Sequence, residues 1–262
     1  MFVHNPFAAL PASIPPIAKQ IYVAVMFLLV VCGTLFDLAH KGSASYFFRH
    51  RRVVSFGARR RVSTGEATAL AVETLVVSVL GAGEFCGMWR RITHLLTMYG
   101  FVLYVLTTAI MVFAYPTTAA PGPAVVAELW YLGALLVCIG GYWFWFLQRV
   151  DVAAEGQSRF RLVRADLFVV SLLASATFAL IWAGFQGAGS DVWANVFFGL
   201  YLLASTALFA SVPWSKFAHM FYKPAAAFQR RIEHANGFRG NLPAPADRPA
   251  TFGSARRQPQ NY

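Results

Sequence analysis

The sequence predicts an all-α integral membrane protein, a bundle of five transmembrane helices. Of the 262 residues, 58% are hydrophobic and only 13% are charged, whereas charged residues make up about a quarter of ordinary soluble domains. Five apolar stretches each reach the roughly 20 residues that a helix needs to cross a bilayer. Basic residues gather in alternate connections between these stretches, which is typical of multi-pass membrane proteins.

The five predicted spans cover residues 20–38, 93–115, 125–147, 166–186 and 193–213. The first begins too late in the chain, and lacks the small-residue cleavage pattern, to be a signal peptide. We therefore expect it to remain as a helix. The transmembrane domain is expected to occupy residues 20–222, between an external tail (1–19) and a cytoplasmic tail (223–262).

A weaker apolar stretch, residues 67–85, is predicted to form an amphipathic interfacial helix in the first cytoplasmic loop. Glu73 lies in the middle of this stretch and glycines follow it. A sixth span here would place two strongly basic segments on opposite faces of the membrane. The stretch is therefore not counted among the spans.

The distribution of lysine and arginine predicts the orientation. Nine of the 22 basic residues lie between the first two spans, four between the third and fourth, and eight after the fifth, and Lys19 alone lies on the other side. The positive-inside rule then places the amino terminus outside and the carboxyl terminus in the cytoplasm. The net charge of the chain is +11. Because the charge is distributed in this way, it indicates a lipid bilayer as partner and no nucleic acid. The expected location is the inner (cytoplasmic) membrane.

Two further sequence features limit the possibilities. The tail after about residue 225 is rich in Pro, Gly, Arg and Asn and has no periodic apolar pattern, so alone it is predicted to be disordered. The three cysteines lack CxxC spacing, which argues against a cysteine-ligated iron–sulfur cluster or structural zinc in this chain. They are Cys32, Cys86 and Cys138.

Two of the six histidines are candidate metal ligands. His94 opens the second predicted span and His219 follows the fifth, so both are expected at the cytoplasmic end of antiparallel helices. Two imidazoles at one depth can bind the iron of a haem b from both sides of its ring. An interfacial role, with each ring bonded to lipid headgroups or carbonyls, would explain the same positions. The other histidines are expected to be solvated or interfacial: His4, His40, His50 and His234.

The residues around this pair resemble the gamma subunit of respiratory nitrate reductase. The segment RRITHLLTMYGFVLYVLTTA, with His94, resembles its second helix, and VPWSKFAHMFYKPAAAFQRR, with His219, resembles the end of its fifth. Related cytochrome b subunits of heterodisulfide reductase, of sulfite-reductase-linked complexes and of the quinone-interacting oxidoreductase share the pattern. The resemblance covers about residues 20–232. The length of the chain and its carboxyl-terminal tail resemble those of the membrane anchor of dissimilatory adenylylsulfate reductase.

The resemblance implies a single haem b. The nitrate reductase subunit holds two haems with four histidines, and His94 and His219 match the pair nearer the cytoplasm. The positions of the other two histidines are Tyr104 and Tyr201. Tyrosine can ligate ferric haem, but a pair of tyrosines is not expected to do so here, and the distal haem is predicted to be absent.

Several neighbouring residues have two interpretations each. Arg90, Arg91 and Lys216 could pair with haem propionates or anchor the helices at the cytoplasmic face. Gly100 and Gly199 could let a flat ring approach the backbone, or could serve close helix packing. The aromatic run at residues 142–146 is expected to form an interfacial belt, with a quinone slot as the less favoured interpretation.

The predicted function is that of an electron-transfer subunit rather than a catalytic chain on its own. It would pass electrons between a cytoplasmic iron–sulfur oxidoreductase, with adenylylsulfate reductase as one candidate, and membrane quinone through the one haem b. The alternative is a haem-free membrane anchor that tethers the same kind of partner. A transporter is disfavoured because the sequence shows no internal repeat and no pair of half-helices.

Overall fold

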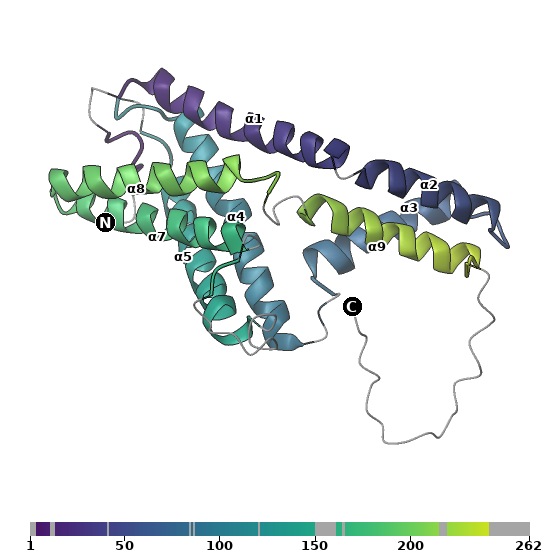
Figure 1. Cartoon of the computed structure of the whole chain (residues 1–262). Coiled ribbons are helices and arrows are strands. Elements are labelled where there is room, and N and C mark those ends of the chain that lie inside the picture. The colour runs from purple at the N-terminus through teal and green to yellow at the C-terminus, as the bar shows by residue number, and fades with distance from the viewer. Residues whose placement is uncertain are drawn as a thin grey trace. The chain divides into compact units, whose positions relative to one another are not determined.

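The structure is a computed structural model, and it describes residues 4–10, 14–40, 42–83, 85, 87–119, 121–149, 161–163, 166–214 and 219–240. Throughout these residues the regular elements are helices, as the sequence predicts (Figure 1). They are α1 (Pro16–His40), α2 (Ser43–Phe56), α3 (Thr64–Glu73), the π-helix η1 (Thr74–Leu80), α4 (Met88–Phe113), α5 (Ala124–Trp143), the π-helix η2 (Phe144–Gln148), α7 (Leu167–Gly187), α8 (Asp191–Ala210) and α9 (His219–Asn236).

The chain divides into two compact units, which are described separately. Unit 1 comprises residues 1–40 and 92–218, and unit 2 comprises residues 41–91 and 219–262. Unit 1 therefore holds nearly all of the apolar sequence. Unit 2 holds most of the basic sequence.

Five helices are long and apolar enough to cross a membrane, which confirms the number of spans predicted. The spanning segments are Pro16–His40, Met88–Phe113, Ala124–Gln148, Leu167–Gly187 and Asp191–Ala210. The second begins at Met88 rather than at residue 93, so the helix extends well before His94. The fifth ends at Ala210 rather than at residue 213, and Pro213 follows three residues later, as prolines commonly do beyond the end of a helix.

Within unit 1, α7 and α8 pack most extensively and form a helical hairpin (Figure 1). Their connection is short, and Gly189 adopts a φ of +75°, a conformation that glycine reaches without steric cost. Ser175 of α7 and Ser205 of α8 lie 2.8 Å apart, oxygen to oxygen, in the buried contact. Hydrogen bonds of this kind, with small side chains, hold membrane helices together where no water is present to drive them together.

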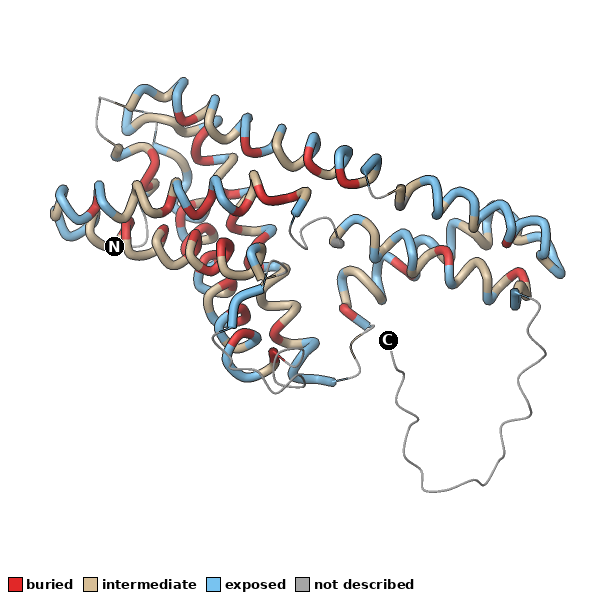
Figure 2. Tube along the Cα trace, viewed as in Figure 1, coloured by how far each residue is buried: buried red, intermediate tan, exposed pale blue. Residues whose placement is uncertain are grey.

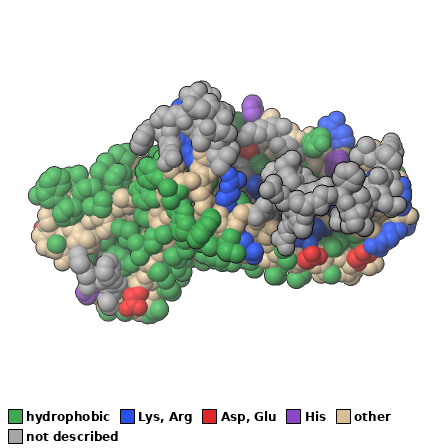
Figure 3. Space-filling model, turned by 90° about the horizontal axis from the view of Figure 1, so that it is seen from below, with side chains coloured by type: hydrophobic (Ala, Val, Ile, Leu, Met, Phe, Trp, Pro, Cys, Tyr) green, Lys and Arg blue, Asp and Glu red, His purple; other side chains and the backbone are tan. Residues whose placement is uncertain are grey.

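The outer faces of these helices are strongly apolar. Leucines such as Leu28, Leu35, Leu106 and Leu203 are more than half exposed. Figure 2 shows pale blue, exposed residues alternating with red, buried ones along the helices, and Figure 3 shows hydrophobic side chains over the surface of unit 1. In water such a surface would cause aggregation. In a bilayer it is the lipid-facing surface, so the chain is a multi-pass membrane protein.

The residues before α1 are folded onto one end of unit 1. Phe7 is buried and packs against Trp130 and Trp182, with ring centroids 5.6 and 5.2 Å away. The Lys19 ammonium donates to the carbonyl oxygens of Phe7 (2.7 Å) and Pro116 (2.9 Å). The predicted external tail is thus tied to the bundle in its described part.

Unit 2 contains α2, α3, η1 and α9, and salt bridges connect them. Arg231 of α9 pairs with Glu73 at the end of α3, and His50 of α2 lies 2.8 Å from the Glu233 carboxylate of α9. The helix predicted at residues 67–85 is present as α3 and η1, over residues 64–80. It begins with a capping interaction, since the amide of Glu66 donates to the Ser63 hydroxyl (3.2 Å).

Helix α9 is the main departure from the sequence prediction, which expected no regular structure after residue 225. Its contacts come from Gln229 and Asn236, which are buried, and from Phe228 and Ile232, which are half-buried. These residues recur at helical spacing. Two of the four are polar, so a search for apolar periodicity does not detect them.

Candidate functional site

The predicted ligand His94 lies half-buried in the second turn of α4, inside unit 1. Its neighbour Thr93 is 1% exposed and donates its hydroxyl to the side-chain oxygen of Gln148 over 2.9 Å. Gln148 ends the π-helix η2, and single π-helical turns within α-helices occur frequently at functional sites. The helical turn that carries His94 is therefore fixed to the end of η2.

A buried charge pair lies next to this contact. Arg149 follows Gln148 and pairs with the Asp166 carboxylate at the start of α7. Its guanidinium carbon lies 4.1 Å from the centre of the Trp145 ring, within the range of a cation–π interaction, and it donates to the carbonyl of Arg161 (2.8 Å). This end of unit 1 thus contains a polar layer that sequence analysis did not identify. The only sign of this polar layer in the sequence was one arginine and one aspartate next to two of the spans.

The contact between α4 and α5 is too close to admit a flat ring. A Cβ atom on Gly100 would lie 2.8 Å from both the Gly133 carbonyl oxygen and the Val137 amide nitrogen. A Cβ atom on Gly140 would lie 2.8 Å from the Thr93 carbonyl oxygen. Of the two interpretations of Gly100, the structure therefore shows close helix packing. A haem at His94 would have to lie on a side of α4 that faces away from α5.

The second predicted ligand, His219, is the first residue of α9 and belongs to unit 2. Its backbone is helical, and its side chain is outside the part of the chain that the structure describes. Lys216 also falls outside the described residues. The structure thus places the two histidines in different units, each at the beginning of a helix.

The predicted propionate partners Arg90 and Arg91 lie one turn before His94, and both are exposed. Arg91 donates its Nε to the carbonyl of Gly81 over 2.6 Å. Because Gly81 directly follows η1, this bond fixes the end of η1 to the beginning of α4. Arg91 thus has a structural contact within unit 2, and its role toward a haem propionate stays a prediction.

The two tyrosines at the positions of the missing histidines lie in one buried group. Tyr104 and Tyr201 are 4% and 5% exposed. The Tyr104 hydroxyl lies 3.4 Å from the Ser175 oxygen, and the Tyr201 hydroxyl interacts with Tyr104 and Ser205. Aromatic rings enclose the group, with Trp130 packed on Tyr104 and Trp182 stacked on Tyr201, each pair of ring centres 5.6 Å apart. This part of the bundle is filled by side chains.

The aromatic run at residues 142–146 has a mixed environment. Tyr142 is exposed, stacks with Phe146, and its hydroxyl lies 2.8 Å from that of Thr177. Trp145 is buried against Arg149. The exposed rings are suited to the predicted interfacial belt, whereas Trp145 belongs to the polar layer described above.

Comparisons with known proteins give one distant relative. No protein-family model matches the chain, and no solved structure matches it. The chain is similar to citrate utilization protein B of Escherichia coli, with 27% identity over 236 residues, which make up 85% of this chain and 61% of that protein. The chain thus spans about three fifths of the length of this relative.

Proposed function

We propose that the chain is the membrane electron-transfer subunit of a larger oxidoreductase. The observation that carries the proposal is the position of His94, half-buried in a five-span unit on a helical turn fixed by the Thr93–Gln148 hydrogen bond. An ionisable residue within a membrane span is by default a candidate functional residue. The residues around it resemble cytochrome b subunits, as described above.

In this proposal His94 and His219 would hold one haem b through their imidazole nitrogens. Neutral imidazole is the donor that haem iron takes in bis-histidine sites, so the chemistry of the two residues fits. Arg90, Arg91 and Lys216 supply positive charge for its propionates. When bound, the haem would carry single electrons, while the chain sets its position and its surroundings. Tyr104 and Tyr201 stand at the positions where the subunit resembled has the histidines of its second haem, so the proposal includes one haem.

The proposed orientation puts the basic segments of unit 2 on the cytoplasmic side of the inner membrane. Among the described residues, unit 2 has twelve Lys and Arg but three Glu, and Figure 3 shows the blue side chains of this unit gathered on its surface. The positive-inside rule supports this side. A basic surface of this kind would attract an acidic iron–sulfur partner. Helix α3 and η1 would lie at the membrane interface, because Val72, Leu75 and Val76 are each about half exposed.

The identity of the soluble partner has two candidates. The resemblance to the membrane anchor of adenylylsulfate reductase supports a partner in sulfur oxidation, with quinone as the other redox partner. The name of the E. coli relative, citrate utilization protein B, supports a partner that acts in carboxylate use. Co-purification of the chain with its soluble partner from native membranes would distinguish the two.

A haem-free anchor is the alternative function. It is favoured by one observation: Gly100, predicted to make room for a ring, is in close contact with Gly133 and Val137 instead. An anchor would need only the five spans and the basic surface of unit 2.

A pyridine haemochrome spectrum of the purified protein, produced with ample haem supply, tests the proposal. We expect a b-type spectrum with about one haem per chain, which the single variants His94→Ala and His219→Ala lose. His40→Ala is the matched control and is expected to keep its haem, because His40 is exposed and stacks on Phe36. A wild-type protein without b-type absorbance, but still bound to its partner, would leave only the anchor.

A further inference from the structure

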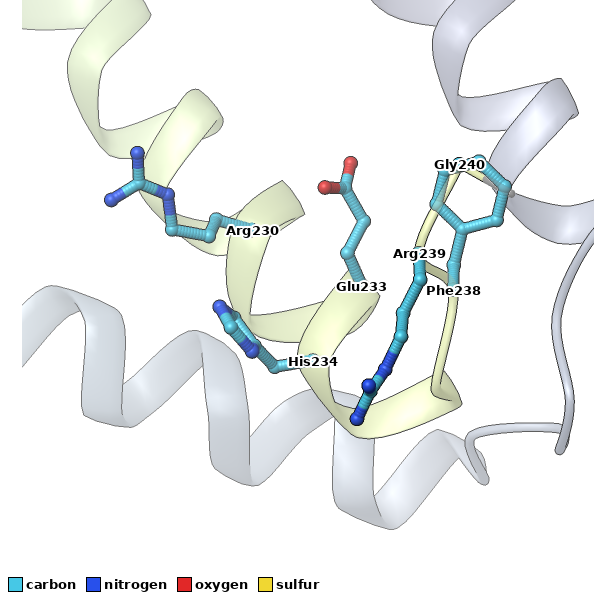
Figure 4. A pocket seen from close by; sticks show the side chains of 6 residues that line it. All are labelled: Arg230, Glu233, His234, Phe238, Arg239 and Gly240. Carbon is cyan, nitrogen blue, oxygen red and sulfur yellow. The ribbon is translucent and has the colours of Figure 1, made fainter. Parts of the chain in front are cut away.

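One side of helix α2 is in contact with the end of α9. Val54 is buried on this side, and the His50 imidazole lies 2.8 Å from the Glu233 carboxylate of α9. The Phe238 ring, which follows α9, lies next to the same imidazole, with the two ring centroids 6.3 Å apart. Figure 4 shows Glu233 and the Phe238 ring pointing away from His234. The contact with α2 therefore comes from one side of the end of α9.

The opposite side of α2 exposes large apolar side chains. Phe56 is 91% exposed and Phe48 is 57% exposed. Phe48, Arg52 and Phe56 follow one another at intervals of four residues, and residues so spaced are neighbours on the surface of a helix. Two phenylalanines left in water would forgo the favourable free energy that burial of apolar surface provides. We call the surface formed by Phe48, Arg49, Arg52 and Phe56 the outer face of α2.

The outer face is positively charged. Helix α2 contains Arg49, Arg51 and Arg52 but no aspartate or glutamate, and all three arginines are exposed. The arginine salt bridges in the described part of unit 2 are made by Arg60 and Arg231, which lie outside α2. Arginine combined with exposed aromatic residues on one helix is typical of helices that lie on an anionic membrane surface.

The chain itself brings α2 near a membrane surface. Helix α1 has 25 residues, and at 1.5 Å per residue it is about 37 Å long. That length exceeds the hydrocarbon core, which is about 30 Å thick, so a spanning helix of this length reaches the headgroup layer. Two residues connect His40, the end of α1, to Ser43, the start of α2, and three Cα steps extend over at most about 11 Å. The start of α2 is therefore within reach of lipid headgroups.

We propose that the outer face of α2 binds anionic phospholipids. Phe48 and Phe56 enter the boundary between headgroups and acyl chains, while Arg49 and Arg52 donate hydrogen bonds to phosphate oxygens. Arginine suits this position, since its apolar stem lies along apolar surface while its charged end stays at the headgroups. An acidic protein would attract the same arginines, but the short connection to a spanning helix favours lipid. The soluble partner proposed above is then left with the other basic residues of unit 2.

The first test measures the accessibility of the outer face in the full-length protein. Ser55 is exposed and lies two turns after Phe48, on the same side of α2. A nitroxide is attached at Ser55→Cys, with the three native cysteines replaced by alanine, in nanodiscs of phosphatidylcholine with or without phosphatidylglycerol. We expect phosphatidylglycerol to lower the collision rate of the label with a water-soluble relaxant by about twofold or more. The control label, at His234→Cys on α9, should be equally accessible in both kinds of nanodisc.

The second test uses charge-matched variants that keep the native cysteines. Native mass spectrometry counts the lipids retained after release from nanodiscs of equal parts phosphatidylglycerol and phosphatidylcholine. Arg49→Gln/Arg52→Gln is expected to lower the retained ratio of phosphatidylglycerol to phosphatidylcholine by about twofold or more, because each arginine near the surface attracts anionic lipid. The control, Arg61→Gln/Arg239→Gln, removes the same charge from exposed positions outside α2 and should leave the ratio unchanged.

The proposal is overturned if the label at Ser55→Cys is equally accessible with and without phosphatidylglycerol, or if both double variants lower the lipid ratio equally. Shielding of the label in detergent, together with the mass of a dimer, would assign the outer face to a second copy of the chain. Shielding that appears only when the soluble partner is added would assign the outer face to that partner, against the proposal. None of these measurements needs haem, so they stand apart from the haemochrome test of the proposed function.

Discussion

Thr93 of α4 donates a hydrogen bond to Gln148 at the end of η2, and each of the two residues is next to a side chain of interest. Thr93 precedes His94, and Gln148 precedes the buried Arg149. The bond thus joins the residue before the predicted haem ligand His94 to the residue before Arg149. Arg149 in turn pairs with Asp166. It is the first target for mutation.

Replacing Thr93 by valine should destabilise the protein by about 1–3 kcal/mol, because the change leaves the side-chain oxygen of Gln148 without its donor in a buried contact. The double variant Thr93→Val/Gln148→Leu should recover part of that loss, since it removes both polar groups. Thermal unfolding in detergent is measured for the wild type, for Thr93→Val, for Gln148→Leu and for the double variant. The four values give the coupling energy of the pair. Strictly additive losses would show that the two side chains do not interact.

Gly100→Ala is expected to destabilise the bundle by about 1–3 kcal/mol or more, as overpacking does in well-packed cores. The added carbon would meet backbone atoms of Gly133 and Val137 at 2.8 Å, and backbone cannot move aside as a flexible side chain can. Gly199→Ala is the control, because nothing lies within 4 Å of its Cβ position. That variant should be neutral or slightly more stable. Both effects are read from thermal unfolding in one detergent.

Lys19→Met should release the segment before α1. The substitution leaves the carbonyls of Phe7 and Pro116 without the ammonium that now bonds both of them, at a cost of about 1–3 kcal/mol for each carbonyl that finds no other donor. Faster hydrogen exchange at residues 4–10 is the expected result. Lys223→Met, an exposed change in unit 2, should leave exchange at those residues unaltered. Unchanged exchange in Lys19→Met would mean that Phe7 packing alone holds the segment.

Restoring histidine at both tyrosine positions should not add a second haem. Tyr104 and Tyr201 are packed against Trp130 and Trp182, and Phe7 covers the two tryptophans. These side chains fill the space around the two tyrosines. The haem-to-protein ratio of Tyr104→His/Tyr201→His, measured by pyridine haemochrome, should equal that of the wild type. A ratio higher by one would show that this core can open.

Acidification should loosen the start of α3. The guanidinium of Arg60 hydrogen-bonds the Glu66 carboxylate (2.8 Å) and lowers the pKa of Glu66 below its ordinary value of 4.5. A lowered folded-state pKa means that the pair stabilises the helix start above pH 4.5, and that this contribution is lost as the pH falls through the lowered pKa. Hydrogen exchange at residues 62–68 should therefore show less protection as the pH falls from 5 to about 3. Arg60→Gln should show weaker protection at pH 5 and a smaller change.

The spans were predictable, whereas the contacts between them were not. Length and apolarity identify all five helices because the bilayer imposes both requirements on each helix separately. The bonds of Thr93 with Gln148, and of Ser175 with Ser205, join residues far apart in the sequence, and single-chain patterns carry no information on such pairs. Helix α9 was missed for a related reason, since its buried residues include Gln229 and Asn236. His94 was singled out as a candidate ligand because a histidine in an apolar stretch is conspicuous without any structure, and that role stays a prediction.

The hairpin of α7 and α8 has a consequence for biosynthesis. Ser175 has its hydroxyl partners on other helices, Ser205 of α8 among them. A chain that lacked α8 would leave this hydroxyl without Ser205, so that only Tyr104 of α4, 3.4 Å away, remained as a side-chain partner among lipid tails that offer no hydrogen bond. Such an unfinished chain would present a marker that membrane quality-control proteases could recognise, and the completed hairpin would hide it.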